Sequence, residues 1–488
     1  MHSRNRWKNS RPVIRNNLPL SMDDCICATA TPMGNGGISV IRLSGRDAVE
    51  IAEKVTRCRK GSLSEMKSHR LKFAEFVAQD AKGTEMLDEG VVGLFLAPQS
   101  YTGEDVVEFS CHASPYIVRR LLEALVTAGA RMAEPGEFTQ RAFLNGKMDL
   151  SQAEAVADLI AGESRAVHDI ALRQLRGGFS SEIEELRQKL LDFVALVELE
   201  LDFSEEDVEF ADRGRLRELL QAIADKVDAL RRSFQTGNAL KEGIRVAIVG
   251  KPNAGKSTLL NALLHEERAL VSDIPGTTRD TIEEVWQIAG VKFRFMDTAG
   301  LRQGQDEVER MGIGRTLEKM RQAQAWLYLF DMETMTLEAA RQEVETWKQG
   351  LGADAGGEDT NMMGNIKVIF VANKVDAVGR GAERVGDTVY LSARDRLGMD
   401  LLEDALRELI PEMPDANAVV LTNARHYEAL GLVQEDLKRI AEGMENNLPG
   451  DLLAMDIRSA IDHLGLITGK ILTDDVLGNV FSRFCIGK

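Results

Sequence analysis

The stretch IRVAIVGKPNAGKSTLLNALL occupies residues 244–264 and decides the fold of the middle of the chain. An apolar run of strand length, Ile244–Val249, leads into the pattern Gly-x-x-x-x-Gly-Lys-Ser at 250–257, and a helical run follows. Glycines in this pattern let backbone amides surround a phosphate at a helix N-terminus. The stretch therefore predicts a phosphate-binding loop, in which Lys256 neutralises phosphate oxygens and Ser257 offers a hydroxyl to Mg²⁺.

Three further motifs follow expected strands downstream of this loop. They are Asp297-Thr-Ala-Gly300, Asn373-Lys-Val-Asp376 and Ser392-Ala-Arg394. An ionised carboxylate at Asp376 can accept hydrogen bonds from the ring N–H and the amino group of guanine, a donor pair that adenine lacks. The order of these motifs predicts a GTPase, with Thr278 of a switch loop as a second Mg²⁺ ligand.

The motifs define most of the expected GTP contacts. They are Asn253, Ala254, Gly255, Lys256, Ser257, Thr258, Thr278, Asp297, Thr298, Ala299, Gly300, Asn373, Lys374, Asp376, Ser392, Ala393 and Arg394. The position after Gly300 holds Leu301, where Ras-like enzymes place a glutamine that orients the attacking water. Because leucine cannot polarise water, another group must take that role, and the carboxylates of residues 306–309 are candidates.

The pattern of apolar residues in the remaining sequence predicts a multidomain α/β and α+β protein. Residues 22–140 are rich in short apolar runs and predict an α+β domain, whereas residues 243–410 alternate strands and helices like a doubly wound parallel sheet. Helical periodicity fills residues 141–242 and 411–488. We therefore expect a helical domain that is interrupted by an inserted Ras-like P-loop GTPase domain.

Two long amphipathic helices are expected in the first helical block. The first carries apolar residues from Val156 through Val167 to Leu175, and the second from Ile183 to Val197. A glycine-rich segment, Gly350–Gly364, is expected to form a surface loop.

Composition restricts the class of protein. The net charge of −17 argues against a chain-wide footprint for nucleic acid, so RNA must be held locally or through a partner. Five cysteines without paired zinc-ligand spacing fit reduced thiols in the cytoplasm. No apolar run reaches the length of a membrane span.

The first 21 residues carry five Lys or Arg and no acid. They fit an organelle transit peptide, a disordered basic arm, or translated upstream sequence before a start at Met22, and we favour the last of these.

Several further motifs are distributed along the chain. The most specific is the tail Phe484-Cys-Ile-Gly-Lys488. The others are Ala30-Thr-Pro32, Gly36-Gly37, Thr102-Gly-Glu-Asp105, Pro135-Gly-Glu-Phe138, Arg141-Ala-Phe-Leu-Asn145 and Gly276-Thr-Thr-Arg-Asp280. With these motifs, the chain resembles the MnmE (TrmE) family of tRNA-modification GTPases from about Asp23 to the end.

The resemblance implies a folate-binding N-terminal domain that forms a homodimer, and a flavin-dependent MnmG-like partner in a heterotetramer. Together they would use a tetrahydrofolate one-carbon unit to modify C5 of the tRNA wobble uridine, with glycine or ammonium as second donor. Family folate contacts match Arg42, Glu104, Lys147 and Lys488, and Cys485 matches a cysteine that faces the folate site.

The resemblance also implies that a K⁺ ion stabilises charge at the GTP phosphates. The K⁺ contacts match Asn253, Ser272, Ile274 and Thr277, and the loop around them adds Ser272, Asp273, Ile274, Pro275, Gly276 and Thr277 to the GTP contacts. Glu309 matches the family's water-positioning glutamate.

Two alternative functions fit parts of the same sequence. One is a ribosome-assembly or signalling switch GTPase without modification chemistry, and the other is an organelle-targeted member of the resembled family. The folate positions and the Cys-Ile-Gly-Lys tail favour the modification enzyme over the switch.

Overall fold

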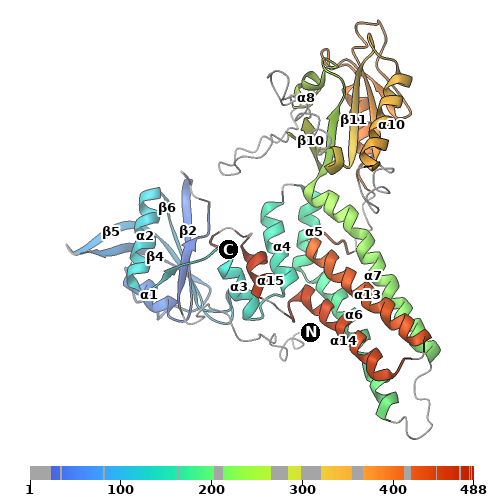
Figure 1. Ribbon diagram of the computed structural model, residues 1–488. Helices are drawn as coiled ribbons and strands as arrows, with labels where there is room; N and C mark the ends of the chain where they lie inside the picture. The colour runs from blue at the N-terminus through green and yellow to red at the C-terminus, as the bar shows by residue number, and fades with distance from the viewer. Residues whose placement is uncertain are drawn as a thin grey trace. The chain divides into compact units, whose positions relative to one another are not determined.

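The computed structural model describes the chain in two compact units (Figure 1). It describes residues 24–32, 34, 36–80, 83–162, 164–202, 213–264, 284–297, 320–353, 366–411, 419–446, 448–471, 474–482, 484 and 486–488. The first unit comprises the described residues of Met1–Ala161, Ala171–Arg231 and Ala424–Lys488, and the second those of Gly162–Ile170 and Arg232–Asn423. No helix in these ranges is long and apolar enough to span a membrane.

The first unit begins with a seven-stranded sheet in the order β3-β4-β5-β6-β2-β1-β7. Its strands are β1 (Ile26–Thr29), β2 (Gly36–Ser44), β3 (Thr56–Cys58), β4 (Arg70–Asp80), β5 (Gly83–Phe95), β6 (Val106–Ala113) and β7 (Arg131–Met132). Alternate residues such as Ile41 and Leu43 are buried with α1 (Ala48–Lys54) and α2 (Pro115–Ala128). The expected α+β architecture is confirmed.

Eight helices in the described part of the chain lie before and after the segment that carries the GTPase motifs. They are α3 (Glu137–Leu144), α4 (Leu150–Ala161), α5 (Arg165–Leu175), α6 (Gly178–Asp202), α7 (Arg213–Glu242), α13 (Ala424–Glu445), α14 (Gly450–Thr468) and α15 (Asp474–Phe481). Helix α14 packs against both α6 and α13. Segments before and after the GTPase motifs therefore share one helical body, as the insertion hypothesis requires.

The prediction of one long helix from Val156 to Leu175 was wrong, because the structure has two helices there, α4 and α5. Gly162 follows the end of α4, and Ser164 precedes α5 with its hydroxyl accepting a hydrogen bond from the Val167 amide at 3.3 Å. Glycine has a low helix propensity and Ser164 caps α5, so one helix ends and the next begins although the apolar spacing continues.

The second unit contains a seven-stranded sheet in the order β13-β14-β12-β11-β8-β10-β9. Its strands are β8 (Ile244–Val249), β9 (Glu284–Ile288), β10 (Val291–Asp297), β11 (Ala325–Asp331), β12 (Lys367–Asn373), β13 (Glu383–Val385) and β14 (Thr388–Tyr390). Strands β10, β8, β11, β12 and β14 are parallel to one another. Their carboxyl ends consequently meet at one edge of the sheet.

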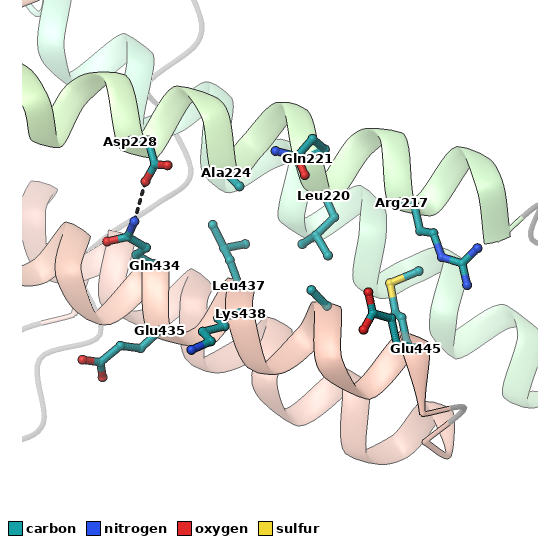
Figure 2. A pocket seen from close by; sticks show the side chains of 12 residues that line it. Arg217, Leu220, Gln221, Ala224, Asp228, Gln434, Glu435, Leu437, Lys438 and Glu445 are labelled. Atoms are coloured by element: carbon teal, nitrogen blue, oxygen red, sulfur yellow. Dashed lines mark hydrogen bonds between the residues drawn. The ribbon is translucent and has the colours of Figure 1, made fainter.

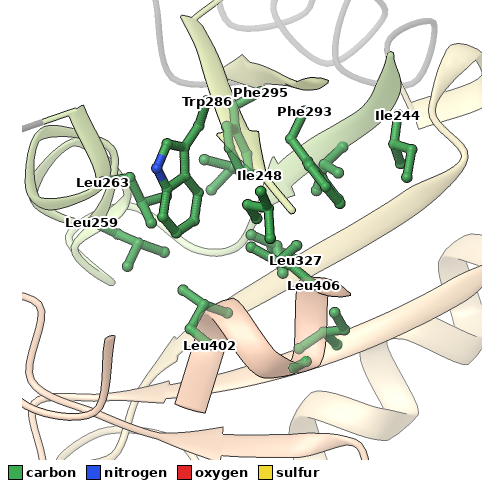
Figure 3. Packing of buried hydrophobic residues seen from close by; sticks show 14 of the residues in the cluster. Ile244, Ile248, Leu259, Leu263, Trp286, Phe293, Phe295, Leu327, Leu402 and Leu406 are labelled. Carbon is green, nitrogen blue, oxygen red and sulfur yellow. The ribbon is translucent and has the colours of Figure 1, made fainter. Parts of the chain in front are cut away.

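Helices cover both faces of this sheet. On one face, Trp286 and Phe295 pack with Leu259 of α8 (Lys256–Leu264) and Leu402 of α12 (Met399–Arg407) (Figure 3). On the other, the core includes Val344 of α10 (Leu337–Ala353). This confirms the doubly wound α/β prediction. Helix α10 includes Gly350, so the start of the expected glycine-rich loop is helical, and most of the rest lies outside the described residues.

The entry to and the exit from the second unit lie against each other. The Leu421 amide donates to the Ser233 hydroxyl of α7 at 3.0 Å. A Cβ on Gly237 would lie 2.1 Å from the Leu421 carbonyl oxygen, so only glycine allows this approach. We call this contact between α7 and the segment that precedes α13 the stem.

A buried ionic cluster stabilises the helical body where the chain leaves this stem. Glu154 of α4 accepts a hydrogen bond from Arg425 Nε at 2.8 Å and lies 2.7 Å from His426 Nε2. Arg425 also donates to the carbonyl of Leu466 near the end of α14 at 2.6 Å. Burial alone would raise the pKa of Glu154, but the charges of His426 and Arg425 hold that pKa at about 2.

This lowered pKa predicts how acid affects the helical body. Ionised Glu154 stabilises the folded state fully above the ordinary pKa of 4.5, and the contribution is lost as the pH falls towards 2. Glu154→Gln should lower the free energy of unfolding at pH 7 by about 3 to 5 kcal/mol, because it leaves buried cations uncompensated. Urea unfolding followed by circular dichroism at several pH values would measure both effects.

Glu428→Gln is the matched control, because Glu428 lies exposed on α13. It should leave both the stability and its acid dependence almost unchanged. Equal behaviour of the two variants between pH 4.5 and 2 would show that Glu154 carries no special share of the acid sensitivity.

Candidate GTP site and candidate folate site

The phosphate-binding loop connects β8 to α8, as predicted. Gly250 has a φ of +146°, and a Cβ there would lie 2.0 Å from the Leu329 carbonyl oxygen of β11. Gly255, at a φ of +102°, is similarly confined by the Asn373 side chain. Both glycines are therefore required by backbone conformation and by close approach to neighbouring strands.

The polar side chains of this loop lie at its surface. Lys256 Nζ donates to the carbonyl oxygens of Gly250 at 2.6 Å and Lys251 at 2.9 Å, so its ammonium group lies over the loop. Asn253 is exposed, with a φ of 63°, and Ser257 and Thr258 are exposed in the first turn of α8. Hydroxyl, amide and ammonium groups thus gather where a helix N-terminus favours an anion.

Asn373 joins the loop to the motifs of the neighbouring strands. Its side chain is buried, donates from Nδ2 to the Ala254 carbonyl at 2.8 Å, and accepts at Oδ1 from the Ala393 amide at 3.0 Å. Three of the predicted GTP motifs are thereby held together through one amide group. The sequence analysis assigned Asn373 to the nucleotide and missed this bridging role.

Lys374 and Asp376 lie beyond this bridge. Lys374 Nζ is 2.6 Å from Asp331 at the end of β11, and that hydrogen bond raises the pKa of Lys374. Burial alone would raise the pKa of Asp331, but its bonds with Lys374 and the Glu333 amide lower it. Asp331 was not predicted, although its place at a parallel strand end was a signal. Asp376 is exposed and available to a base.

The Ser392-Ala-Arg loop is closed by its own hydrogen bonds. The buried Ser392 hydroxyl accepts from the Asp395 amide at 3.2 Å, and the Ser392 amide donates to the Leu397 carbonyl at 3.0 Å. Ala393 is buried, and Arg394 is exposed. This local closure keeps the Ala393 amide in place for Asn373.

The remaining predicted GTP and K⁺ residues are only partly described. Asp297 ends β10, with its backbone in register with Ile248 of β8, at the same sheet edge as the phosphate loop. Thr298, Ala299, Gly300, Ser272–Thr278 and Glu309 lie outside the described residues.

A second group of predicted residues gathers in the first unit, around Arg42 of β2. Arg42 Nε donates to Glu108 at 2.9 Å, and its guanidinium lies 5.1 Å from the centre of the Tyr101 ring. Arg42 Nη1 is buried and has no hydrogen-bond partner among the described residues. A buried guanidinium donor of this kind suits an anionic or carbonyl acceptor.

Glu104 belongs to an ionic network beside Arg42. It accepts from the Ser44 hydroxyl at 2.7 Å and from Arg141 Nη1 at 3.2 Å. Arg141 in turn binds Glu137 at 3.0 Å, within the Pro135–Phe138 motif. The network connects three motifs that carried the family resemblance, which the sequence could not show.

Lys147 and the C-terminal tail lie next to these residues. Lys147 Nζ donates to the Pro98 carbonyl at 2.8 Å, and its side chain is 3.4 Å from the Cβ position of Gly103. A Cβ on Gly487 would lie 1.9 Å from the Thr29 carbonyl oxygen. Because Thr29 and Ala28 pair with Ile41 and Arg42, the tail that ends at Lys488 reaches the Arg42 strand pair.

The tail is fixed on its other side by aromatic packing. Phe484 is buried with Phe481 and Phe143, and a Cβ on Gly136 would lie 2.6 Å from the Phe481 carbonyl oxygen. Cys485 itself lies outside the described residues.

The N-terminal cysteines behave as packing residues. Burial raises the pKa of the Cys27 thiol to about 12 and that of Cys111 to about 11. Cys25 is also buried, with a raised pKa. Thiols with such pKa values are unreactive at neutral pH.

A groove between α7 and α13 has a volume of about 540 Å³ (Figure 2). Gln434 donates to Asp228 across it at 2.5 Å, and Leu220 and Leu437 line it together with charged residues. None of the predicted site residues lines this groove.

The position of Asp376 yields a test of base recognition. In Asp376→Asn, the amide can no longer accept two donors from guanine, and GTP affinity should fall about a hundredfold. Xanthosine triphosphate, with a carbonyl in place of the amino group, should bind this variant better than GTP. Fluorescent-nucleotide titration would measure both affinities, with the exposed Asp404→Asn as control. Unchanged preference for GTP would remove Asp376 from the base site.

Comparison with known proteins covers almost the whole chain. Family models described as "GTP-binding protein TrmE N-terminus" and "MnmE helical domain" match residues 25–147 and 150–485. The tRNA modification GTPase MnmE of Christiangramia forsetii is 47% identical over 479 residues, covering 96% of this chain and 100% of that protein. That of Cytophaga hutchinsonii is 47% identical, covering 95% and 98%.

Solved GTPase structures match with low scores. Aquifex aeolicus Era bound to GDP and aluminium fluoride is 24% identical and covers 39% of this chain and 66% of Era, with a TM-score of 0.25. The two family models and the curated relatives carry the assignment. The chain belongs to the MnmE family of tRNA modification GTPases.

Proposed function

We propose that this chain hydrolyses GTP and, with a flavin-dependent MnmG-like partner, modifies C5 of the tRNA wobble uridine. The group installed is carboxymethylaminomethyl or aminomethyl, and a tetrahydrofolate derivative supplies one carbon. The proposal extends the family assignment, and the Asn373 bridge is the observation that supports its GTP step most directly.

The GTP step assigns distinct roles to the residues of the second unit. Lys256 and the loop amides hold the phosphates, Asp376 holds guanine, and Asn373 keeps the loops in register. Glu309 positions the attacking water in place of the glutamine that Leu301 replaces. Catalysis then rests on positioning and on charge stabilisation.

Two cations complete this site in our proposal. The exposed hydroxyl of Ser257 in the first turn of α8 fits a Mg²⁺ ligand, with Thr278 as the second. The exposed amide of Asn253 fits K⁺ coordination, with Ser272, Ile274 and Thr277. When bound, both ions supply positive charge that stabilises phosphoryl transfer.

The folate step is assigned to the residues around Arg42. The unpartnered Arg42 Nη1 and the ammonium groups of Lys147 and Lys488 suit the glutamyl carboxylates or ring carbonyl of a folate. Glu104 suits pterin N–H groups, and Arg141 and Ser44 hold it in position. Tetrahydrofolate supplies the one-carbon unit, and Cys485 is the candidate reactive group of the tail.

The domain division of the sequence analysis also belongs to this proposal. Residues 22–140 would bind folate and form the homodimer, residues 243–410 would bind GTP, and residues 141–242 and 411–488 would connect them. The assembly with the MnmG-like partner would be a cytoplasmic heterotetramer.

The connection between the two steps follows the chain. Motion of the GTP-binding unit would act on the stem at Gly237 and Leu421. Leu421 lies three residues before Ala424, where α13 begins. Arg425 then contacts both α4 and α14. We infer that GTP turnover reaches the folate site along this route.

Cation dependence tests the GTP step. Hydrolysis should be about tenfold or more faster in K⁺ than in Na⁺ at equal ionic strength, which corresponds to a barrier lower by about 1.4 kcal/mol. Asn253→Ala should abolish this difference and retain GTP binding. Steady-state phosphate release would measure the rates. Rates indifferent to the cation would favour an ordinary switch GTPase.

Ligand binding tests the folate step separately. Arg42→Ala should weaken binding of 5-formyltetrahydrofolate about tenfold or more, because it removes a charged donor from a buried site. Calorimetric titration would measure the affinity, with the exposed Arg119→Ala of α2 as control. K⁺-dependent GTP hydrolysis should not change in either variant. Equal folate affinity in both variants would exclude Arg42 as a contact.

A further inference from the structure

Positive charge is concentrated in one short segment of the first unit. Residues 54–72 contain seven Lys or Arg and one acid, Glu65, in a chain whose net charge is −17. The cations are Lys54, Arg57, Arg59, Lys60, Lys67, Arg70 and Lys72. Such segregation indicates a local anion-binding surface rather than a general solubility effect.

The fold places this segment at the edge of the N-terminal sheet. Strand β3 forms one edge of the sheet, opposite the β7 edge, and the loop after β3 returns into β4. Lys72 Nζ donates to the Ser62 carbonyl at 3.0 Å, and Glu65 accepts from the Ser62 amide at 3.1 Å. The only acid of the segment thus helps to close the loop.

We call Arg57, Arg59, Lys60, Lys67 and Arg70 the basic edge; all five are exposed. Arg59 lies 3.2 Å from Glu89. Glu75 stands opposite Arg57 in the strand register. Among the described residues, the other four have no ion-pair partner within 4.0 Å. Unpaired, exposed cations keep their full capacity to bind phosphate.

Flat side chains lie within the same surface. The Arg59 guanidinium is 5.3 Å from the centre of the Phe73 ring, which is 47% exposed. The exposed His69 ring stands edge-on to Phe95 at 5.5 Å. Cations interleaved with partly exposed rings are the combination that binds single-stranded or loop RNA, through phosphate contacts and base stacking.

The basic edge is separate from the candidate folate site. Strands β4, β5 and β6 lie between β3 and β2, which carries Arg42. Four strand spacings of roughly 4.8 Å place the two strands roughly 19 Å apart. A small folate bound at Arg42 therefore does not account for the basic edge.

We propose that the basic edge binds the sugar-phosphate backbone of the tRNA substrate. This inference rests on the proposed function, in which tRNA is the molecule modified. It also gives the local RNA contact that an acidic chain needs, within the same domain that is proposed to hold the one-carbon donor.

The test uses the full chain and an unmodified tRNA transcript. Arg57→Ser, Lys60→Ser and Lys67→Ser are combined in one variant, and the matched control combines Arg119→Ser, Lys189→Ser and Arg407→Ser. The control removes the same charge from helix positions whose side chains are 40 to 67% exposed. Binding is measured by fluorescence anisotropy between about 50 and 200 mM salt.

The basic-edge variant should bind tRNA about tenfold or more weakly, and its slope of log affinity against log salt should be smaller by about 2 to 3. The control should remain close to the parent chain. Phe73→Leu should weaken binding severalfold without changing the salt slope, because stacking releases no counterions. Light scattering should give the same oligomeric state for all variants.

Three outcomes would overturn the inference. They are equal losses in the basic-edge variant and the control, no binding of tRNA by the parent chain at low salt, or capture of phosphatidylglycerol vesicles in preference to tRNA. K⁺-stimulated GTP hydrolysis, measured in parallel, separates the outcomes. If it persists while the basic edge proves irrelevant, the proposed function stands and only this inference fails.

Discussion

The GTP-binding unit depends on one buried side-chain amide. Asn373 donates to the carbonyl of Ala254 and accepts from the amide of Ala393, so the loops after β8, β12 and β14 share one fixed spacing. A buried amide with both groups satisfied fixes geometry more strictly than apolar packing does, because any displacement leaves polar atoms unpaired. Gly255 reinforces this constraint, since a Cβ there would lie 2.2 Å from the Asn373 nitrogen. The exposed side chains of Ser257 and Asp376 can vary in conformation, but their backbones are held.

Glycines also allow close backbone contacts where segments distant in the sequence meet. Gly237 admits the Leu421 carbonyl against the side of α7, Gly136 admits the Phe481 carbonyl, and Gly487 admits the Thr29 carbonyl. In each case a glycine lets backbone from a distant part of the sequence come within contact distance. The first contact joins the entry and the exit of the GTP-binding unit. The second brings the end of α15 to the start of α3, and the third brings the C-terminal tail to the N-terminal sheet. Insertion of one domain into another is compatible with stable packing because these junctions are short and local.

Charge is distributed unevenly over this architecture. The ionic groups of the helical body are mutually compensated, as Glu154 with Arg425 and His426 shows. The Glu104 and Arg141 network near Arg42 is also compensated, but Arg42 Nη1 is left without a partner in the described part of the chain. Burial of charge is tolerated where partners are present. A buried donor without a partner is therefore stronger evidence for a ligand site than a large number of exposed charged side chains is.

The sequence by itself determined the class of fold, the GTP motifs and the family. Phosphate-loop spacing, strand-length apolar runs and helical periodicity are local patterns, and local patterns report local structure. These patterns failed between α4 and α5, where the apolar spacing predicted one continuous helix. The glycine at 162 and the capping serine at 164 divide that helix into two. Only the tertiary structure decided that Asn373 bridges two loops, that Asp331 binds Lys374, and that Gly487 lies against Thr29. These contacts join residues that are far apart in the chain. They depend on how the chain folds in space, which the spacing of residues along the sequence does not specify.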